Sequence, residues 1–168
     1  MFSQCAMLAA PPAAPPVLTY IGRFTATQSG TVLTAAGASI GTASADRLVV
    51  VTFAVSNIYD AASNNIVSGT IGGAAATKVV STGGGGYITE TSIFTLLVTS
   101  GTTADLAVTV ATDGGGNLKG AFDVYTITGL QSYSAYSSNS NLDSGAYITS
   151  LTTTVNIAAG GCAIGAAH

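Results

Sequence analysis

The chain has 168 residues, of which 7% are charged and 48% hydrophobic, with 21 Gly, no Trp and a formal net charge of −3. This length fits one domain, and about 150 residues bury enough surface to build a core without metal or disulfide. The basic residues are scattered, which excludes a phosphate-binding patch for nucleic acid, and no apolar run approaches the roughly 20 residues of a membrane-spanning helix.

The low charge is informative in itself. An ordinary soluble domain carries about 25% charged residues, so Ser, Thr, Ala and Gly must form most of this surface. Net charge keeps monomers apart in solution, and a surface without it is poorly protected against association. We therefore expect much of it to face other protein in an assembly. A secreted β-sandwich with a Ser- and Thr-coated exterior is the alternative.

The chain begins with a Pro-rich segment, residues 1–16, which reads MFSQCAMLAAPPAAPP. Its two Pro-Pro pairs favour an extended polyproline path and forbid a helix across them. No Lys or Arg precedes the short apolar part, so it lacks the pattern of a signal peptide. We expect an extended arm that contacts a neighbouring subunit through Pro11, Pro12, Pro15 and Pro16, or else a disordered tail.

Strand-length segments follow, and the central four, 47–56, 66–81, 92–100 and 104–111, are rich in Val, Ile and Thr and bounded by Gly, Ser or Asn. All the segments together are residues 17–24, 29–41, 47–56, 66–81, 92–100, 104–111, 121–130, 151–158 and 160–167. Residues 47–56 are apolar on both faces, as in a central strand. Leu106, Val108 and Val110 alternate with small or polar residues, as in a strand with one buried face. Residues 29–41 resemble a weak edge strand.

No stretch shows the period of an amphipathic helix, and the Gly-rich stretches 82–87 and 113–120 fit turns better than phosphate or calcium loops. The sequence therefore predicts an all-β protein. We expect a single β-sandwich of about eight strands over residues 17–168, either immunoglobulin-like or jelly-roll, with the arm 1–16 in front.

Two motifs resemble the IPT/TIG immunoglobulin-like module. Residues 69–81, GTIGGAAATKVVS, resemble its TIGG-x-A-A-T hairpin, and residues 100–110, SGTTADLAVTV, resemble its GTT-x-D-x-x-V-T-V strand. With SIGTASADRLVVV at 39–51, the pattern spans residues 39–130 and is similar to a module in structural proteins of tailed bacteriophages. The resemblance implies a virion component without distinguishing head from tail. The arm and the tail after Gly129 match neither pattern.

The sequence lacks the groups of a catalytic site. Its only histidine is His168 at the C-terminal end, where fraying is the default. Cys5 and Cys162 lack zinc spacing and are expected to be buried or free thiols, with a disulfide that closes one long loop as the alternative. The acidic residues Asp46, Asp60, Glu90, Asp105, Asp113, Asp123 and Asp143 are not adjacent, and most fall at turns or on outward strand faces. Catalysis needs a base beside a nucleophile, or paired carboxylates. We predict a non-enzymatic protein without cofactor or metal.

A Tyr/Ser segment is the best candidate for recognition. Residues 131–147, QSYSAYSSNSNLDSGAY, interleave Tyr133, Tyr136 and Tyr147 with Ser and Asn. Tyr gives contact area at low entropic cost, and Ser and Asn adapt their hydrogen bonds. We expect an interface with a neighbouring subunit. A polar loop with its rings folded onto the sandwich edge, and a site that stacks on a sugar ring, are the alternatives.

These observations favour a structural protein of a tailed-phage particle, most directly a capsid decoration protein located in the virion. Its expected partners are other copies of itself, as a trimer by analogy, and other virion proteins such as the major capsid protein. The alternatives are a tail or fibre protein that binds host glycan, and a secreted adhesin or pilus-like subunit at the cell surface. Neither nucleic acid nor a membrane is an expected partner.

Overall fold

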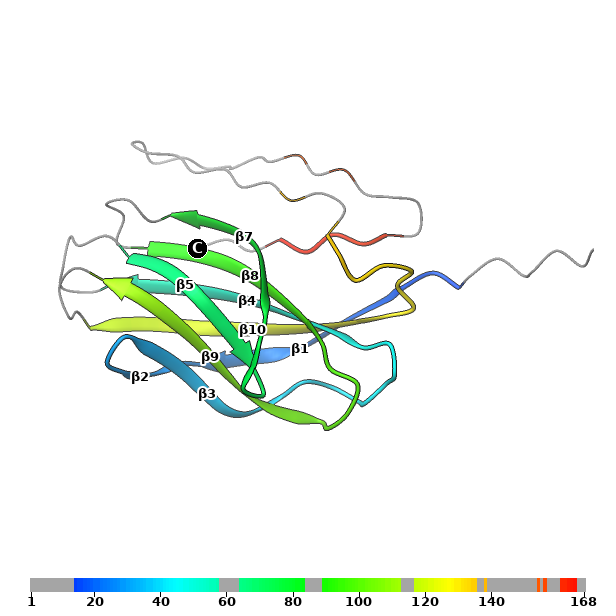
Figure 1. The fold of residues 1–168 in the computed structure, drawn as a ribbon, viewed down its shortest axis with the longest axis horizontal. Helices are drawn as coiled ribbons and strands as arrows, with labels where there is room; N and C mark the ends of the chain where they lie inside the picture. Colours follow the sequence, from blue (N-terminus) through cyan, green and yellow to red (C-terminus); the bar gives the residue numbers. More distant parts are fainter. Residues whose placement is uncertain are drawn as a thin grey trace, which may run out of the picture.

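The computed structural model describes residues 14–57, 64–83, 89–112, 117–135, 138, 154, 156 and 161–165. In these ranges all regular secondary structure is β-strand (Figure 1). The strands are β1 (Val17–Thr25), β2 (Thr27–Ser29), β3 (Val32–Ser39), β4 (Leu48–Asn57), β5 (Asn64–Ile71), β6 (Ala74–Ala75), β7 (Thr77–Gly83), β8 (Thr89–Leu97), β9 (Thr103–Thr112) and β10 (Leu118–Thr128). The same ranges contain no helix of the length and hydropathy needed to span a bilayer.

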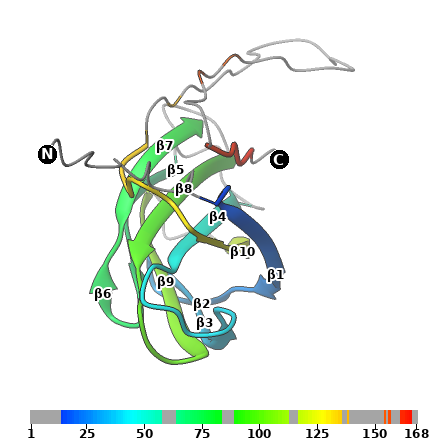
Figure 2. The ribbon, with the colours of Figure 1, turned by 90° about the vertical axis from the view of Figure 1, so that its right-hand side faces the viewer.

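The strands form two antiparallel sheets that pack face to face (Figures 1 and 2). The first sheet has the order β1-β10-β4-β8-β7, and the second has the order β2-β3-β9-β5-β6. The prediction of an all-β sandwich is confirmed. β4, which is apolar on both faces, is the middle strand of the first sheet, as its sequence indicated.

The strand order decides between the two sandwich topologies that the sequence left open. Successive long strands alternate between the sheets, except that β7 and β8 are neighbours in one sheet: β1, β4, β7, β8 and β10 lie in the first, whereas β3, β5 and β9 lie in the second. β1 and β10 pair with each other. This winding is that of a jelly roll. An immunoglobulin-type sandwich instead keeps its first two strands side by side in one sheet.

The chain passes between the sheets along both edges of the sandwich. At one edge, β6 pairs with β5 in the second sheet and β7 pairs with β8 in the first. Only Ala76 separates β6 from β7, and its N–H donates to the Gly69 carbonyl at 2.9 Å. β1 and β2 are likewise separated only by Ala26, whose N–H donates to the Gly120 carbonyl at 2.9 Å. The backbone hydrogen bonds therefore continue through both corners.

The main core lies between the sheets and follows the two-residue period of the strands. It takes Val49, Val51, Phe53 and Val55 from β4, and Leu106, Val108 and Val110 from β9. These side chains are at most 2% exposed. The alternation predicted for residues 104–111 is therefore confirmed.

The segment 66–81 is not one strand but a hairpin with a continuation. It contains β5, β6 and most of β7, with a turn at Gly72 and Gly73. The φ angles of these two glycines are 60° and 78°, which is the left-handed pair that a type I′ turn requires. The TIGG motif thus marks a tight turn.

The C-terminal segment differs from its prediction. Residues 160–167 were expected to add a last strand, but the described part, residues 161–165, forms none. Instead Cys162 and Ile164 pack on the outer face of the first sheet, over Leu48, Val50 and Ile127. These outward side chains are apolar and need cover, which explains why the segment lies across the sheet rather than at its edge. The predicted strand 151–158 falls mostly outside the described residues.

Candidate functional site

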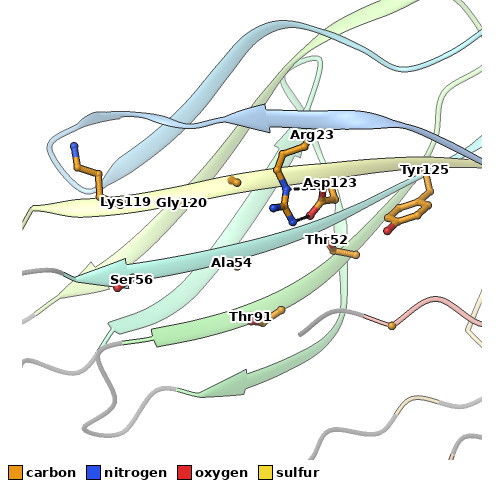
Figure 3. A pocket seen from close by; sticks show the side chains of 11 residues that line it. Arg23, Thr52, Ala54, Ser56, Thr91, Lys119, Gly120, Asp123 and Tyr125 are labelled. Carbon is orange, nitrogen blue, oxygen red and sulfur yellow. Dashed lines mark hydrogen bonds and ion pairs between the residues drawn. The ribbon is translucent and has the colours of Figure 1, made fainter. Parts of the chain in front are cut away.

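The outer face of the first sheet carries an open groove of about 580 Å³ (Figure 3). Its lining includes the short side chains Thr52, Ala54, Ser56, Thr91 and Ala121 from β4, β8 and β10. The groove forms where the outward side chains of β4 are short, from Thr52 to Ser56, while Phe53 and Val55 point into the core. Arg23, Asp123 and Tyr125 line one side, and Lys119, Gly120 and Gly165 complete the described lining.

A fixed polar cluster joins β1 to β10 beside the groove. Arg23 donates two hydrogen bonds to the Asp123 carboxylate, from Nε to Oδ1 at 2.9 Å and from Nη2 to Oδ2 at 2.7 Å (Figure 3). The Tyr20 hydroxyl donates to Asp123 Oδ1 at 3.1 Å, and the Tyr20 and Tyr125 rings lie 5.0 Å apart. The register pairs residue 23 with residue 123, which allows this bidentate contact.

The cluster shifts the ionisation of its members. The hydrogen bonds from Arg23 lower the pKa of the Asp123 carboxyl and raise the pKa of the Arg23 guanidinium. Partial desolvation, followed by the hydrogen bond to Asp123, raises the pKa of the Tyr20 hydroxyl. At neutral pH both groups are therefore ionised, and the positive charge of Arg23 offsets the negative charge of Asp123.

Two threonine hydroxyl groups in the groove are nearly buried. Thr52 and Thr91 are only 5% and 6% exposed, and both line the groove. Within the part of the chain that the structure describes, neither side chain has a hydrogen-bond partner. Buried polar groups are normally hydrogen-bonded, so these hydroxyls are available to water or to a ligand that enters the groove.

Arg47 is fully buried and serves the fold rather than the groove. All five of its guanidinium N–H groups have backbone carbonyl acceptors, which lie on two loops at one end of the sandwich. The acceptors are Ile40 (3.2 Å), Gly41 (2.6 Å), Val98 (2.9 Å), Ser100 (2.9 Å) and Gly101 (2.9 Å). Burial lowers the pKa of the guanidinium, although arginine stays protonated in proteins.

Glu90 and Lys78 bridge from the first sheet to the free edge of β5. The Ile66 N–H donates to Glu90 Oε2 at 2.7 Å, and Lys78 Nζ donates to the Ile66 carbonyl at 2.7 Å. Ser81 also donates to Glu90, which is 3% exposed. The two side chains thus satisfy backbone groups that would otherwise be open on this edge.

The other described acidic side chains also bond within the molecule. Asp46 accepts hydrogen bonds from the Ser44 hydroxyl and from the Gly129 N–H, and both lower the pKa of its carboxyl. Asp105 accepts the Gly37 N–H at 2.8 Å. Among the charged residues in the described ranges, only Lys119 has no bond of this kind. The surface therefore presents even less free charge than the composition suggested.

The predicted interface residues are only partly described. Pro15 and Pro16 lie beside Gly129, since a Cβ at Gly129 would be 3.5 Å from Pro16 Cα and 3.6 Å from the Pro15 carbonyl oxygen. Tyr133 follows β10 and is 40% exposed. Pro11, Pro12, Tyr136 and Tyr147 lie outside the described residues.

Comparisons with protein-family models, curated proteins and solved structures found no match for this chain. Its function must therefore be argued from its own residues.

Cys162 is a free, half-buried thiol whose pKa is raised by burial. Within the described ranges no three His, Cys, Asp or Glu side chains are grouped to hold a metal ion.

The sequence did not predict that these residues form a groove. Arg23 and Asp123 are 100 residues apart, and only the pairing of β1 with β10 makes them neighbours. The one available signal was the row of short residues on the outward positions of β4, Thr52, Ala54 and Ser56, within an otherwise apolar strand.

Proposed function

We propose that this chain is a non-enzymatic structural protein of a tailed-phage particle, most directly a capsid decoration protein that binds neighbouring subunits. One observation carries the assembly role: within the part of the chain that the structure describes, every charged side chain except Lys119 is bonded within the molecule. Burying an unpaired charge costs several kcal/mol, and the central parts of protein interfaces are depleted in charge. A surface whose ions already have partners is suited to being covered by another subunit.

The phage assignment rests on the sequence resemblance over residues 39–130, which includes the β5–β6 turn and β9. The topology is a jelly roll and not the immunoglobulin type that this resemblance implied, so the resemblance is limited to its hairpin and strand motifs. A jelly roll is itself compatible with a virion role, because this architecture recurs in viral capsid proteins. That support is analogy at the level of the fold, since one fold serves many functions. The partners in this proposal are other copies of the chain, expected as a trimer by analogy, and the major capsid protein.

The described surface indicates how such a subunit would make contacts. The sandwich is the rigid body, and the last part of the arm, Pro15 and Pro16, lies beside Gly129 at the end of β10. Tyr133 lies close by in the sequence and is exposed. The arm and the Tyr/Ser segment would thus emerge from the same end of the first sheet and reach a common neighbour.

The test is a binding experiment with purified phage particles that lack the protein. We expect the chain to co-sediment with them in a fixed copy number per particle, and a variant without residues 1–16 to bind less. The unaltered β-sheet circular dichroism of the truncated variant is the control for folding. A chain that stays monomeric at high concentration and binds no particle would contradict the proposal.

A second candidate function, glycan binding, is favoured by the groove itself. Its two buried threonine hydroxyls need hydrogen-bonding partners, the Tyr125 ring offers an apolar face, and the paired Arg23 adds no net charge. A neutral, hydroxyl-rich sugar matches this set.

Calorimetric titration with a glycan panel tests the idea. Binding should weaken in Thr52→Val and Thr91→Val but not in Thr34→Val on the second sheet. The absence of binding to every glycan would refute it.

A further inference from the structure

The edges of the two sheets are protected to different degrees. Free strand edges invite pairing with other chains, and proteins guard them with short strands, bulges or charged side chains. In the second sheet, β2 has three residues and β6 has two, while Glu90 and Lys78 cap the exposed part of β5. In the first sheet, a bulge between Lys78 and Val80 interrupts β7.

β1 is the exception. It has nine residues, and in the described ranges it pairs only with β10, so its other edge is free. Figure 2 shows it along the right-hand margin of the sandwich. Its first part carries exposed apolar side chains, Val17 at 59%, Leu18 at 41% and Tyr20 at 54%. A bulge at Ile21 ends this flat run, and Arg23 is engaged by Asp123.

We propose that residues Leu18–Tyr20 of β1 pair antiparallel with the same residues of a second copy, around a two-fold axis at Thr19. The first sheets of the two copies then form one continuous ten-stranded sheet. The pairing satisfies the open backbone groups of both edges and covers the apolar side chains that each copy leaves exposed.

A second copy fits this edge because the segment is self-complementary. With the axis at Thr19, Leu18 of one copy lies opposite Tyr20 of the other, on the same face of the sheet. Aromatic and aliphatic cross-strand pairs of this kind stabilise a sheet. No charged residue lies between Val17 and Gly22, so identical strands meet without like-charge repulsion.

The residues before β1 agree with this arrangement. Pro15 and Pro16 have no N–H to donate, so the ladder must end at Val17. Antiparallel pairing places Pro16 of one copy beside Gly22 of the other.

The pairing through β1 rests on the proposed function in one respect: it identifies a second copy of the chain as the first partner of a subunit that assembles. The two ideas fail separately. A chain that binds particles without pairing through β1 overturns only the inference. A chain that pairs through β1 but binds no particle overturns only the proposed role in a phage. The pairing is two-fold, so it predicts a dimer rather than the trimer expected by analogy.

Cysteine cross-linking tests the axis directly. Residues opposite each other in an antiparallel pair have Cα atoms about 4.5–5.5 Å apart, within the range of a disulfide. In a Cys5→Ser, Cys162→Ser background, Thr19→Cys should form a disulfide-linked dimer under mild oxidation. Thr77→Cys, an exposed threonine on the other edge strand of the same sheet, is the matched control and should remain monomeric.

A second variant tests the pairing without cross-linking. Thr19→Lys places two ammonium groups together at the axis and should raise the dimer dissociation constant about tenfold or more in sedimentation equilibrium. Thr77→Lys should leave it unchanged. Unaltered thermal unfolding of both variants shows that they are folded. Equal cross-linking of the two cysteine variants, a dimer insensitive to Thr19→Lys, or a trimer or monomer of the wild type would overturn the inference.

Discussion

At the scale of the residue, Arg47 shows how a charge is used inside this protein. Its guanidinium is the common donor to carbonyls of residues 40–41 and 98–101, which lie just beyond the last residue pair of β3 and β9, Ser39 with Thr103. Arginine suits the position because its planar fork offers five donors in fixed directions. This one side chain therefore adds five hydrogen bonds to the two loops, beside the backbone bond from the Ile40 N–H to the Thr102 carbonyl.

Replacing Arg47 should be among the most damaging single changes in the chain. Arg47→Met keeps the apolar stem but leaves buried carbonyls without donors, each at a cost of about 1–3 kcal/mol, so we expect a loss of at least about 3 kcal/mol. Arg47→Lys retains the charge and fewer bonds, and should lose less. Urea unfolding measures both. A Met variant as stable as wild type would contradict this role.

The contribution of the Arg23–Asp123 pair to the stability of the fold should depend on pH. The pKa of Asp123 is lowered in the folded state, so the pair contributes stability above the unfolded value of about 4 and loses it as pH falls through the folded pKa. Asp123→Asn should therefore be less stable than wild type at pH 7, with a difference that shrinks in acid. The effect is modest because Arg23 is 68% exposed.

Urea unfolding of both proteins across a pH series measures this difference. Arg23→Gln is the matched control, because it removes the cause of the pKa shift while leaving the carboxyl in place. It should reduce the pH dependence in the same window. A difference between Asp123→Asn and wild type that stays constant from neutral to acid pH would contradict the assignment.

At the scale of the element, the contact of β10 with β4 depends on one glycine. A Cβ at Gly120 would lie 2.6 Å from Phe53 Cζ and 2.8 Å from the Ala54 carbonyl oxygen. The Phe53 ring is fully buried and packs against Phe122 at 4.5 Å, so it has little room to move. The absence of a side chain at Gly120 lets the two central strands pair while the ring fills the core beneath them.

Gly120→Ala should therefore destabilise the protein, by about 1–3 kcal/mol as in other overpacked cores. Thermal or urea unfolding measures the loss. Gly165→Ala is the matched control, because nothing lies within 4 Å of its Cβ position, and it should be close to neutral. Equal stability of the two variants would show that the strands adjust freely at Gly120.

At the scale of the whole molecule, the low free charge governs how subunits would attract each other. Surface ion pairs weaken with salt, because the Debye length falls from about 10 Å at 0.1 M to about 3 Å at 1 M. An interface built on apolar side chains and backbone pairing lacks that sensitivity. Self-association of this chain should therefore persist at 1 M salt, as light scattering or sedimentation would show. Dissociation by salt would indicate an interface held by ion pairs.

The sequence by itself determined the class of the fold and several of its parts. The two-residue period showed which side chains of β9 are buried, and the two apolar faces of β4 indicated a central strand. The TIGG motif resembled a hairpin, whose turn the structure places at Gly72 and Gly73. These features are local, because the backbone alternates and because only glycine adopts two successive left-handed conformations easily. The low charge likewise followed from composition alone.

Only the tertiary structure decided which strands are neighbours, and with that the groove. A period of two says which face of a strand is buried, but not against which strand or in which register it pairs. The contact of Arg23 with Asp123 and the five acceptors of Arg47 therefore had no local signal. For the same reason, residues 161–165 appeared as a strand in the sequence, whereas the apolar outer face of the first sheet, assembled from distant segments, holds them as a cover.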